Sequence, residues 1–121
     1  MVDDKTTISE LKSLVQTFCE DRNWDEFHDP KELAIGVVTE ASELLDIFRF
    51  KSKEQMSTLL IDSVRRNDIE DELADTLYFL LRFAQLYNID LSDVISKKIK
   101  KNEKKYPLHL AKGSNKKYTE Y

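Results

Sequence analysis

The sequence predicts an all-α fold in one domain, residues 1–121, and three observations support this. Only two Gly and two Pro interrupt the 121 residues, 35% of the residues are charged, and apolar residues recur at helical spacing in several segments. The length suffices for one apolar core but not for two ordinary domains. We therefore expect a bundle of four to five helices.

The first helix is expected over residues 9–21. Thr7 and Glu10 have the spacing of a capping box at its start. Its apolar stripe consists of Leu11, Leu14, Val15 and Phe18. Such a helix is amphipathic and packs on another element.

The second helix has the clearest start in the chain. Asp29, Pro30 and Glu32 supply an N-cap, an N1 proline and an N3 glutamate, and the helix should continue to about residue 49. Its broad apolar side consists of Leu33, Val37, Val38, Ala41, Leu44, Leu45 and Phe48. Gly36 on this helix is expected to let another backbone come close.

The remaining segments predict a short helix, two longer helices and a tail. The short helix is expected around 54–61 within the polar stretch 50–67. The next helix, 68–87, is apolar nearly all round beyond Asp75, which predicts that a partner subunit covers one side. Asp90 and Asp93 cap the last helix, Pro107 ends it, and the tail 109–121 should be extended or irregular.

Charge and apolar patterning exclude several classes of protein. The formal net charge is −4 and no groove-binding motif is present, which disfavours a nucleic-acid partner. The N-terminus has no apolar signal region and the best apolar run, 76–83, is too short to cross a bilayer, so we expect no membrane partner and a cytoplasmic location. Cys19 is the single cysteine and is expected to be a packing residue, without a redox or zinc role.

Two pairs of carboxylates are the most informative feature of the chain. Glu40 and Glu43 lie on the second helix, and Glu72 and Asp75 lie on the fourth. At i, i+3 spacing two side chains share one helix face, with Cβ atoms about 5 to 6 Å apart. If the helices pack antiparallel, the two pairs converge, and like charges about 4 Å apart repel by about 4 kcal/mol at an effective dielectric of 20. The alternative is that these acids simply face solvent.

The residue types around the acids indicate which cation would compensate this repulsion. No histidine or thiolate accompanies either pair, so a Glu-x-x-His di-iron site is disfavoured. Oxygen-only ligation favours Mg²⁺, with Mn²⁺ as a substitute, and Mg²⁺ commonly shares its coordination shell with substrate phosphates. Asp46, another i+3 step along, is a candidate third ligand on its helix.

Basic and aromatic residues supply candidates for nucleotide contacts. Lysines crowd the C-terminal part, where one face of the last helix presents Lys98, Asn102, Lys105 and Tyr106. This combination suits phosphate and sugar, although a lysine run is equally typical of a solvated face. Trp24 and His28, beside a helix start, could contact a base, whereas their ordinary role would be structural.

The order Glu40-x-x-Glu43, about thirty residues, then Glu72-Leu-Ala-Asp75 resembles the ExxE…ExxD signature of the MazG-like all-α nucleoside triphosphate pyrophosphohydrolases. Segments 24–30, 43–48, 98–107 and 117–120 are similar to the dCTP pyrophosphatase branch of that family. The resemblance covers nearly the whole chain.

This resemblance implies a MazG-like bundle that forms a homodimer or a dimer-of-dimers tetramer. It implies Mg²⁺-dependent conversion of a nucleoside triphosphate to the monophosphate and pyrophosphate, as in nucleotide-pool house-cleaning. The implied metal ligands are Glu40, Glu43, Glu72 and Asp75. Glu40 and Glu43 are equal candidates for the catalytic base. The implied substrate contacts are Trp24, His28, Lys98, Asn102, Lys105 and Tyr106.

The chain departs from the dCTP branch in its predicted base pocket. Val15, Phe50 and Phe79 stand where those enzymes carry a histidine, a tryptophan and a tyrosine. Phe50 keeps a stacking face, while the other two lose polar groups, so dCTP or a related modified pyrimidine nucleotide is the favoured substrate without being singled out. The alternative function is a non-catalytic helical module that binds nucleotides or proteins.

Overall fold

The computed structural model describes residues 1–121 and divides the chain into two compact units, Met1–Asn88 and Ile89–Tyr121. Every regular element is helical, which confirms the all-α prediction, and there are six α-helices rather than four or five. The expectation of a single domain over 1–121 stays a prediction.

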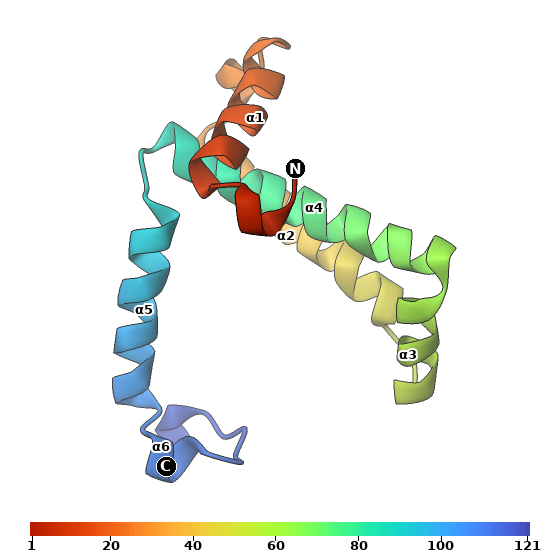
Figure 1. Cartoon of the computed structure of the whole chain (residues 1–121), viewed down its shortest axis with the longest axis vertical. Coiled ribbons are helices and arrows are strands. Elements are labelled where there is room, and N and C mark those ends of the chain that lie inside the picture. The colour runs from red at the N-terminus through yellow and green to blue at the C-terminus, as the bar shows by residue number, and fades with distance from the viewer. The chain divides into compact units, whose positions relative to one another are not determined.

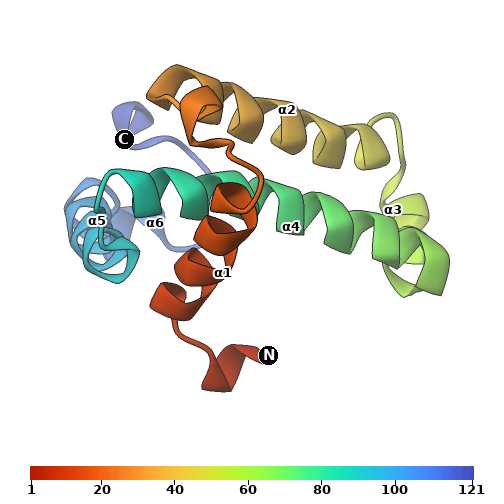
Figure 2. The same cartoon turned by 90° about the horizontal axis from the view of Figure 1, so that it is seen from above.

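The first unit is built on two antiparallel helices that lie side by side (Figures 1 and 2). They are α2, Pro30–Phe48, and α4, Ser63–Leu86. Helix α1, Ile8–Glu20, packs across α4. The short helix α3, Lys53–Ile61, packs on α4 near the place where α2 ends and α4 begins. Two single turns complete the unit, η1 (Asp3–Lys5) and η2 (Asp25–Phe27).

In the first unit, the predicted caps set the starts of α1 and α2. The side chains of Thr7 and Asp29 accept hydrogen bonds from the backbone N–H groups of Glu10 and Glu32, at 3.1 and 2.8 Å. Pro30 occupies the first turn of α2, as expected. Each cap satisfies a donor that the first helical turn would otherwise leave unpaired.

The start of α4 was predicted wrongly. The helix begins at Ser63, five residues before the expected Asp68. The carboxylate of Asp62 accepts from the N–H groups of both Val64 and Arg65, and the bridges Arg65–Asp68 and Arg66–Glu70 support the polar first turns. A charged segment without an apolar stripe can thus be helical when a cap and i, i+3 and i, i+4 ion pairs stabilise it.

The core of the first unit is small. Its buried apolar residues are Val15, Cys19, Leu33, Ile69, Leu81 and Ala84. Gly36 of α2 does allow a close approach, although the group that approaches is the Phe79 ring of α4 and not a backbone: ring atoms lie 2.5 Å from the place where a Cβ would be. Several large apolar side chains on the two long helices stay exposed: Ile35, Val38, Leu45, Leu73, Leu77 and Leu80.

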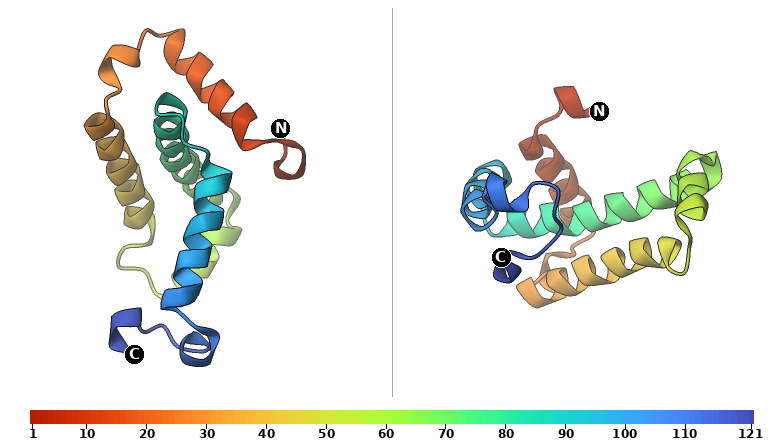
Figure 3. Two further views of the ribbon diagram at one scale, coloured as in Figure 1. Left: turned by 90° about the vertical axis from the view of Figure 1, so that its left-hand side faces the viewer. Right: turned by 90° about the horizontal axis from the view of Figure 1, so that it is seen from below.

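The second unit consists of α5, Leu91–Lys105, followed by α6, Leu108–Ala111, and η3, Tyr118–Glu120 (Figure 3). Asp90 caps α5 through the N–H of Asp93, as predicted. The tail was expected to be irregular from residue 109, but α6 starts directly after Pro107, whose carbonyl accepts from Leu110 and Ala111. No helix in either unit combines the length and apolar character needed to cross a lipid bilayer.

Candidate functional site

The antiparallel packing of α2 and α4 brings three of the four predicted metal ligands together. Glu40 and Glu43 lie one turn apart on α2, and Glu72 lies on α4. One carboxylate oxygen from each of the three is within 4.8 Å of the others. Repulsion between acids at this distance must be compensated, by protons or by a cation.

Two oxygens of this acidic cluster are buried without a partner. Oε2 of Glu40 and Oε2 of Glu72 have no hydrogen bond, whereas the Glu43 residue is exposed. A buried acceptor without a donor is costly, and such orphaned oxygens point to a ligand that is held between them. The solvent-facing alternative therefore does not describe Glu40 and Glu72.

Desolvation and the close packing of these acids raise the pKa values of Glu72 and Glu40. The pKa of Glu72 is raised to about 7, first by desolvation of its carboxylate and then by the adjacent Glu43, Glu40 and Asp75. The pKa of Glu40 is also raised, first by desolvation and then by the side-chain contact with Glu43 and the negative charges of Glu43 and Asp75, while the side chain of Glu72 partly opposes this. In both cases the environment disfavours the ionised form unless positive charge is supplied.

Asp75, the fourth predicted ligand, lies outside the group of three but close enough for its charge to act on both Glu40 and Glu72. Asp46 is exposed and is not part of the cluster. The donor set is thus made of carboxylate oxygens alone, with no histidine nitrogen or cysteine sulfur among them. Such a set fits a hard divalent cation and does not fit a di-iron or zinc site.

The aromatic residues predicted to contact a base lie on loops of the first unit. Trp24 and His28 flank η2, with ring centroids 6.3 Å apart in an edge-to-face arrangement, and the Trp24 ring also packs on Phe18. Phe50, in the turn between α2 and α3, is 90% exposed and has a positive φ of 62°. The Arg49 guanidinium lies over the Phe50 ring, 4.7 Å from its centroid. A large aromatic residue in the left-handed region costs about 1–2 kcal/mol, and such strain is often kept at functional sites.

The other two departures from the dCTP branch have clear structural positions. Val15 is a buried core residue of α1. Phe79 is half-buried, packs edge-to-face on Tyr78 with ring centroids 5.0 Å apart, and lies against Gly36. Both residues therefore serve packing within the first unit.

The predicted phosphate and sugar contacts all belong to the second unit. Lys98 is exposed and Asn102 is half-buried on α5. The Lys105 ammonium lies 5.0 Å from the centroid of the Tyr118 ring. The rings of Tyr118 and Tyr121 pack edge-to-face on Tyr106, at centroid distances of 5.8 and 6.0 Å. The tail thus organises the end of α5, while the approach of these residues to a substrate stays a prediction.

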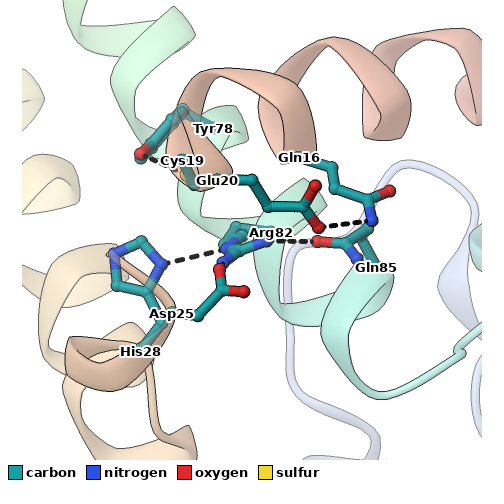
Figure 4. Close-up of polar contacts among 8 residues, drawn as sticks. All are labelled: Gln16, Cys19, Glu20, Asp25, His28, Tyr78, Arg82 and Gln85. Carbon is teal, nitrogen blue, oxygen red and sulfur yellow. Dashed lines mark hydrogen bonds and ion pairs between the residues drawn. The ribbon is translucent and has the colours of Figure 1, made fainter. Parts of the chain in front are cut away.

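Sequence reasoning missed a buried arginine. Arg82 of α4 is completely buried and contacts Asp25, His28 and Gln85 (Figure 4). The available signal was a lone charge within the apolar C-terminal segment of α4, residues 76–86, since a buried charge requires partners. The partners could not be identified because two of them lie more than fifty residues earlier in the chain.

The fold and the site define an all-α protein with a candidate cation site between two antiparallel helices. A model of the MazG-like family matches residues 35–121. dCTP pyrophosphatase 1 of Mus musculus is 32% identical over 114 residues, which cover 94% of this chain and 67% of that protein, and the same figures hold for dCTP pyrophosphatase 1 of Homo sapiens.

A solved structure supports the same assignment. The crystal structure of a pyrophosphatase from Archaeoglobus fulgidus matches with a TM-score of 0.77 and 31% identity, covering 88% of this chain and 98% of that one. The chain belongs to the MazG-like family.

Proposed function

We propose that this protein is a Mg²⁺-dependent pyrophosphohydrolase that converts a deoxynucleoside triphosphate to the monophosphate and pyrophosphate. The observation that supports it most is the acidic cluster between α2 and α4, with two buried oxygens that lack partners. Pyrophosphatase is also the activity in the names of the relatives. In this proposal the enzyme removes unwanted nucleotides from the cytoplasmic pool.

Glu40, Glu43, Glu72 and Asp75 would hold the cation. When bound, Mg²⁺ neutralises the acidic cluster and polarises the substrate phosphates, and Mn²⁺ is expected to substitute for it. Glu40 or Glu43 would accept the proton of the attacking water, since both lie on the α2 face of the cluster. Of these two, Glu43 is exposed to solvent and Glu40 is half-buried.

The remaining contacts would divide by chemistry. Lys98, Asn102, Lys105 and Tyr106 present cations, an amide and a phenol for phosphate and sugar, and the lysines would stabilise charge on departing pyrophosphate. Trp24, His28 and Phe50 would contact the nucleoside. dCTP or a modified pyrimidine nucleotide is the favoured substrate because dCTP pyrophosphatases are among the relatives.

A nucleotide panel tests the activity. Each of the four dNTPs and dCTP modified at C5 is incubated with protein and Mg²⁺, and ion-exchange chromatography measures monophosphate and pyrophosphate. We expect both products in equal amounts, with none in EDTA. Nucleotide binding without any product would instead establish the non-catalytic module.

The variant Glu43→Gln tests the proposed role of Glu43 in hydrolysis. The amide cannot accept the proton and is a poor cation ligand, so we expect hydrolysis to fall at least about a hundredfold. Helicity by circular dichroism should be unchanged, because removing one acid relieves repulsion in the acidic cluster. Full activity in this variant would refute the assignment.

We further propose that the exposed apolar side chains of α2 and α4 form a subunit contact in a homodimer or homotetramer. Val38 of α2 and Leu73, Leu77 and Leu80 of α4 are large, apolar and exposed, and a subunit contact would remove their apolar surface from water. Sedimentation of the wild type should give a multimer, and Leu77→Glu should reduce it to monomers. A monomeric wild type at micromolar concentration would contradict this.

A further inference from the structure

Arg82 is the largest fully buried side chain of the chain, and each of its three guanidinium nitrogens donates one hydrogen bond. Nη1 donates to Oε1 of Gln85 at 2.6 Å, Nη2 donates to Oδ1 of Asp25, and Nε donates to Nδ1 of His28 at 2.9 Å (Figure 4). These bonds tie the loop around η2 to α4. Since Asp25 is more than half exposed, the guanidinium also links a buried position on α4 to the protein surface.

The bond to His28 determines where the imidazole carries its proton. A guanidinium has only donors and does not lose its charge in proteins. Nδ1 of His28 must therefore be the acceptor and bear no hydrogen, so the neutral ring carries its single proton on Nε2. A second proton on Nδ1 would place one N–H against another.

The local charges act in the same direction. The pKa of His28 is lowered by desolvation and by the positive charge of Arg82 from α4, while the Asp25 carboxylate on η2 partly opposes this. The local charges and the hydrogen bond from Arg82 therefore both favour the uncharged ring. Figure 4 shows its other ring nitrogen, Nε2, directed away from Arg82.

We propose that Arg82 is a positioning residue that holds His28 as the Nε2–H tautomer, so that the ring offers one neutral hydrogen-bond donor to the nucleoside. This rests on the proposed function. A neutral donor suits a carbonyl oxygen of a pyrimidine base or a sugar oxygen, and is a weaker choice than a cation for phosphate. The Trp24 ring lies next to the His28 ring, with ring centroids 6.3 Å apart.

Two conservative variants of His28 distinguish a hydrogen-bond donor to the nucleoside from a residue that only supports Arg82. In His28→Gln the amide nitrogen takes the place of Nε2–H, whereas in His28→Asn the amide can replace only Nδ1 as the acceptor for Arg82. We expect KM for the preferred dNTP to rise about tenfold or more in His28→Asn, the effect of one lost hydrogen bond, and much less in His28→Gln. The kcat should change little in either variant.

The opposite order, or equal KM values in the two variants, would overturn the proposal and leave His28 as a structural support for Arg82. Thermal unfolding of both variants is the control. A support role alone predicts that His28→Gln loses more stability than His28→Asn, with no split between KM and kcat.

The tautomer itself can be measured without any activity. Long-range ¹H–¹⁵N correlation spectra of the full-length protein distinguish protonated from unprotonated ring nitrogens, and His109 on α6 serves as an internal reference. We expect the Nε2–H form for His28, and a mixture of tautomers in Arg82→Lys, which keeps the charge but loses the planar fork. The Nδ1–H form or a mixture in the wild type would overturn the proposal, even if nucleotide hydrolysis is confirmed. A pure Nε2–H form in a protein without hydrolysis would refute the proposed function instead and leave the tautomer established.

Discussion

At the scale of single residues, Glu72 places an ionisable group where its charge is poorly tolerated. One of its oxygens is buried without a partner, and Glu40 and Glu43 lie within a few ångströms. The folded protein therefore holds a proton on Glu72 more tightly than the unfolded chain does. The protonation of the Glu72 carboxylate should therefore depend on whether a cation is bound in the acidic cluster.

The raised pKa of Glu72 predicts a pH dependence of stability in the metal-free protein. Its stabilising contribution is fully present below pH 4.5 and is lost as pH rises through about 7, since the folded pKa is about 7 and the usual value is 4.5. Glu72→Gln removes this titration. In EDTA, the melting temperature of Glu72→Gln should therefore increasingly exceed that of the wild type between pH 5 and pH 8.

Glu103→Gln, which removes an exposed carboxylate on α5, is the matched control and should follow the wild type across the same range. A constant difference between Glu72→Gln and the wild type would show that Glu72 is ionised throughout and would contradict the crowding described above.

Phe50 supports a second prediction at this scale. Its ring is exposed and its backbone is left-handed, so Phe50→Gly relieves strain and removes little buried surface. We expect the free energy of unfolding to stay within about 1 kcal/mol of the wild type. KM should rise about tenfold because a stacking face is lost. Steady-state kinetics and urea unfolding measure the two effects.

Phe50→Trp is the control for Phe50, because it keeps a stacking face and should keep a low KM. If Phe50→Gly leaves KM unchanged, the aromatic ring has no role in nucleotide binding and its strained backbone needs another explanation.

At the scale of elements, helices α2 and α5 could be predicted because residues next to their first turns determine where they start. Asp29, Pro30 and Glu32 act within one turn, and so do Asp90 and Asp93. The first five residues of α4 could not be predicted from apolar periodicity, since capping and ion pairs stabilise them. The same distinction between local and tertiary determinants holds for the site. The i, i+3 spacing in the sequence located the carboxylate pairs, whereas the contacts of Arg82 depend on the tertiary fold.

The packing of α2 on α4 predicts an unusual response to a favourable helix substitution. Gly36→Ala should gain about 1 kcal/mol in helix propensity. However, the alanine methyl group would clash with the Phe79 ring, including Cγ, the ring atom bonded to the Phe79 Cβ. Overpacking of this kind typically costs about 1–3 kcal/mol. We therefore expect a net loss of stability, measured by urea unfolding.

A double-mutant cycle provides the control for Gly36. Gly36→Ala combined with Phe79→Ala should be more stable than the sum of the two single effects, because the second change removes the clash. Strict additivity would show that the two residues do not meet in solution.

At the scale of the whole molecule, the chain joins a first unit that carries the acidic cluster to a second unit that carries lysines and tyrosines. A cation that binds only the folded acidic cluster must stabilise the protein by mass action. Mg²⁺ should raise the melting temperature of the wild type in a concentration-dependent way and have little effect on Glu43→Gln. An equal rise in both would indicate non-specific binding to the acidic surface.

The central claim is that carboxylates from α2 and α4 jointly hold a divalent cation, and a crystal structure of the full chain grown with Mn²⁺ tests it most directly. We predict an anomalous difference peak between Glu40, Glu43 and Glu72, with carboxylate oxygens of both helices in its coordination shell. Carboxylates of the acidic cluster turned toward bulk solvent, with no anomalous peak between them, would contradict the account.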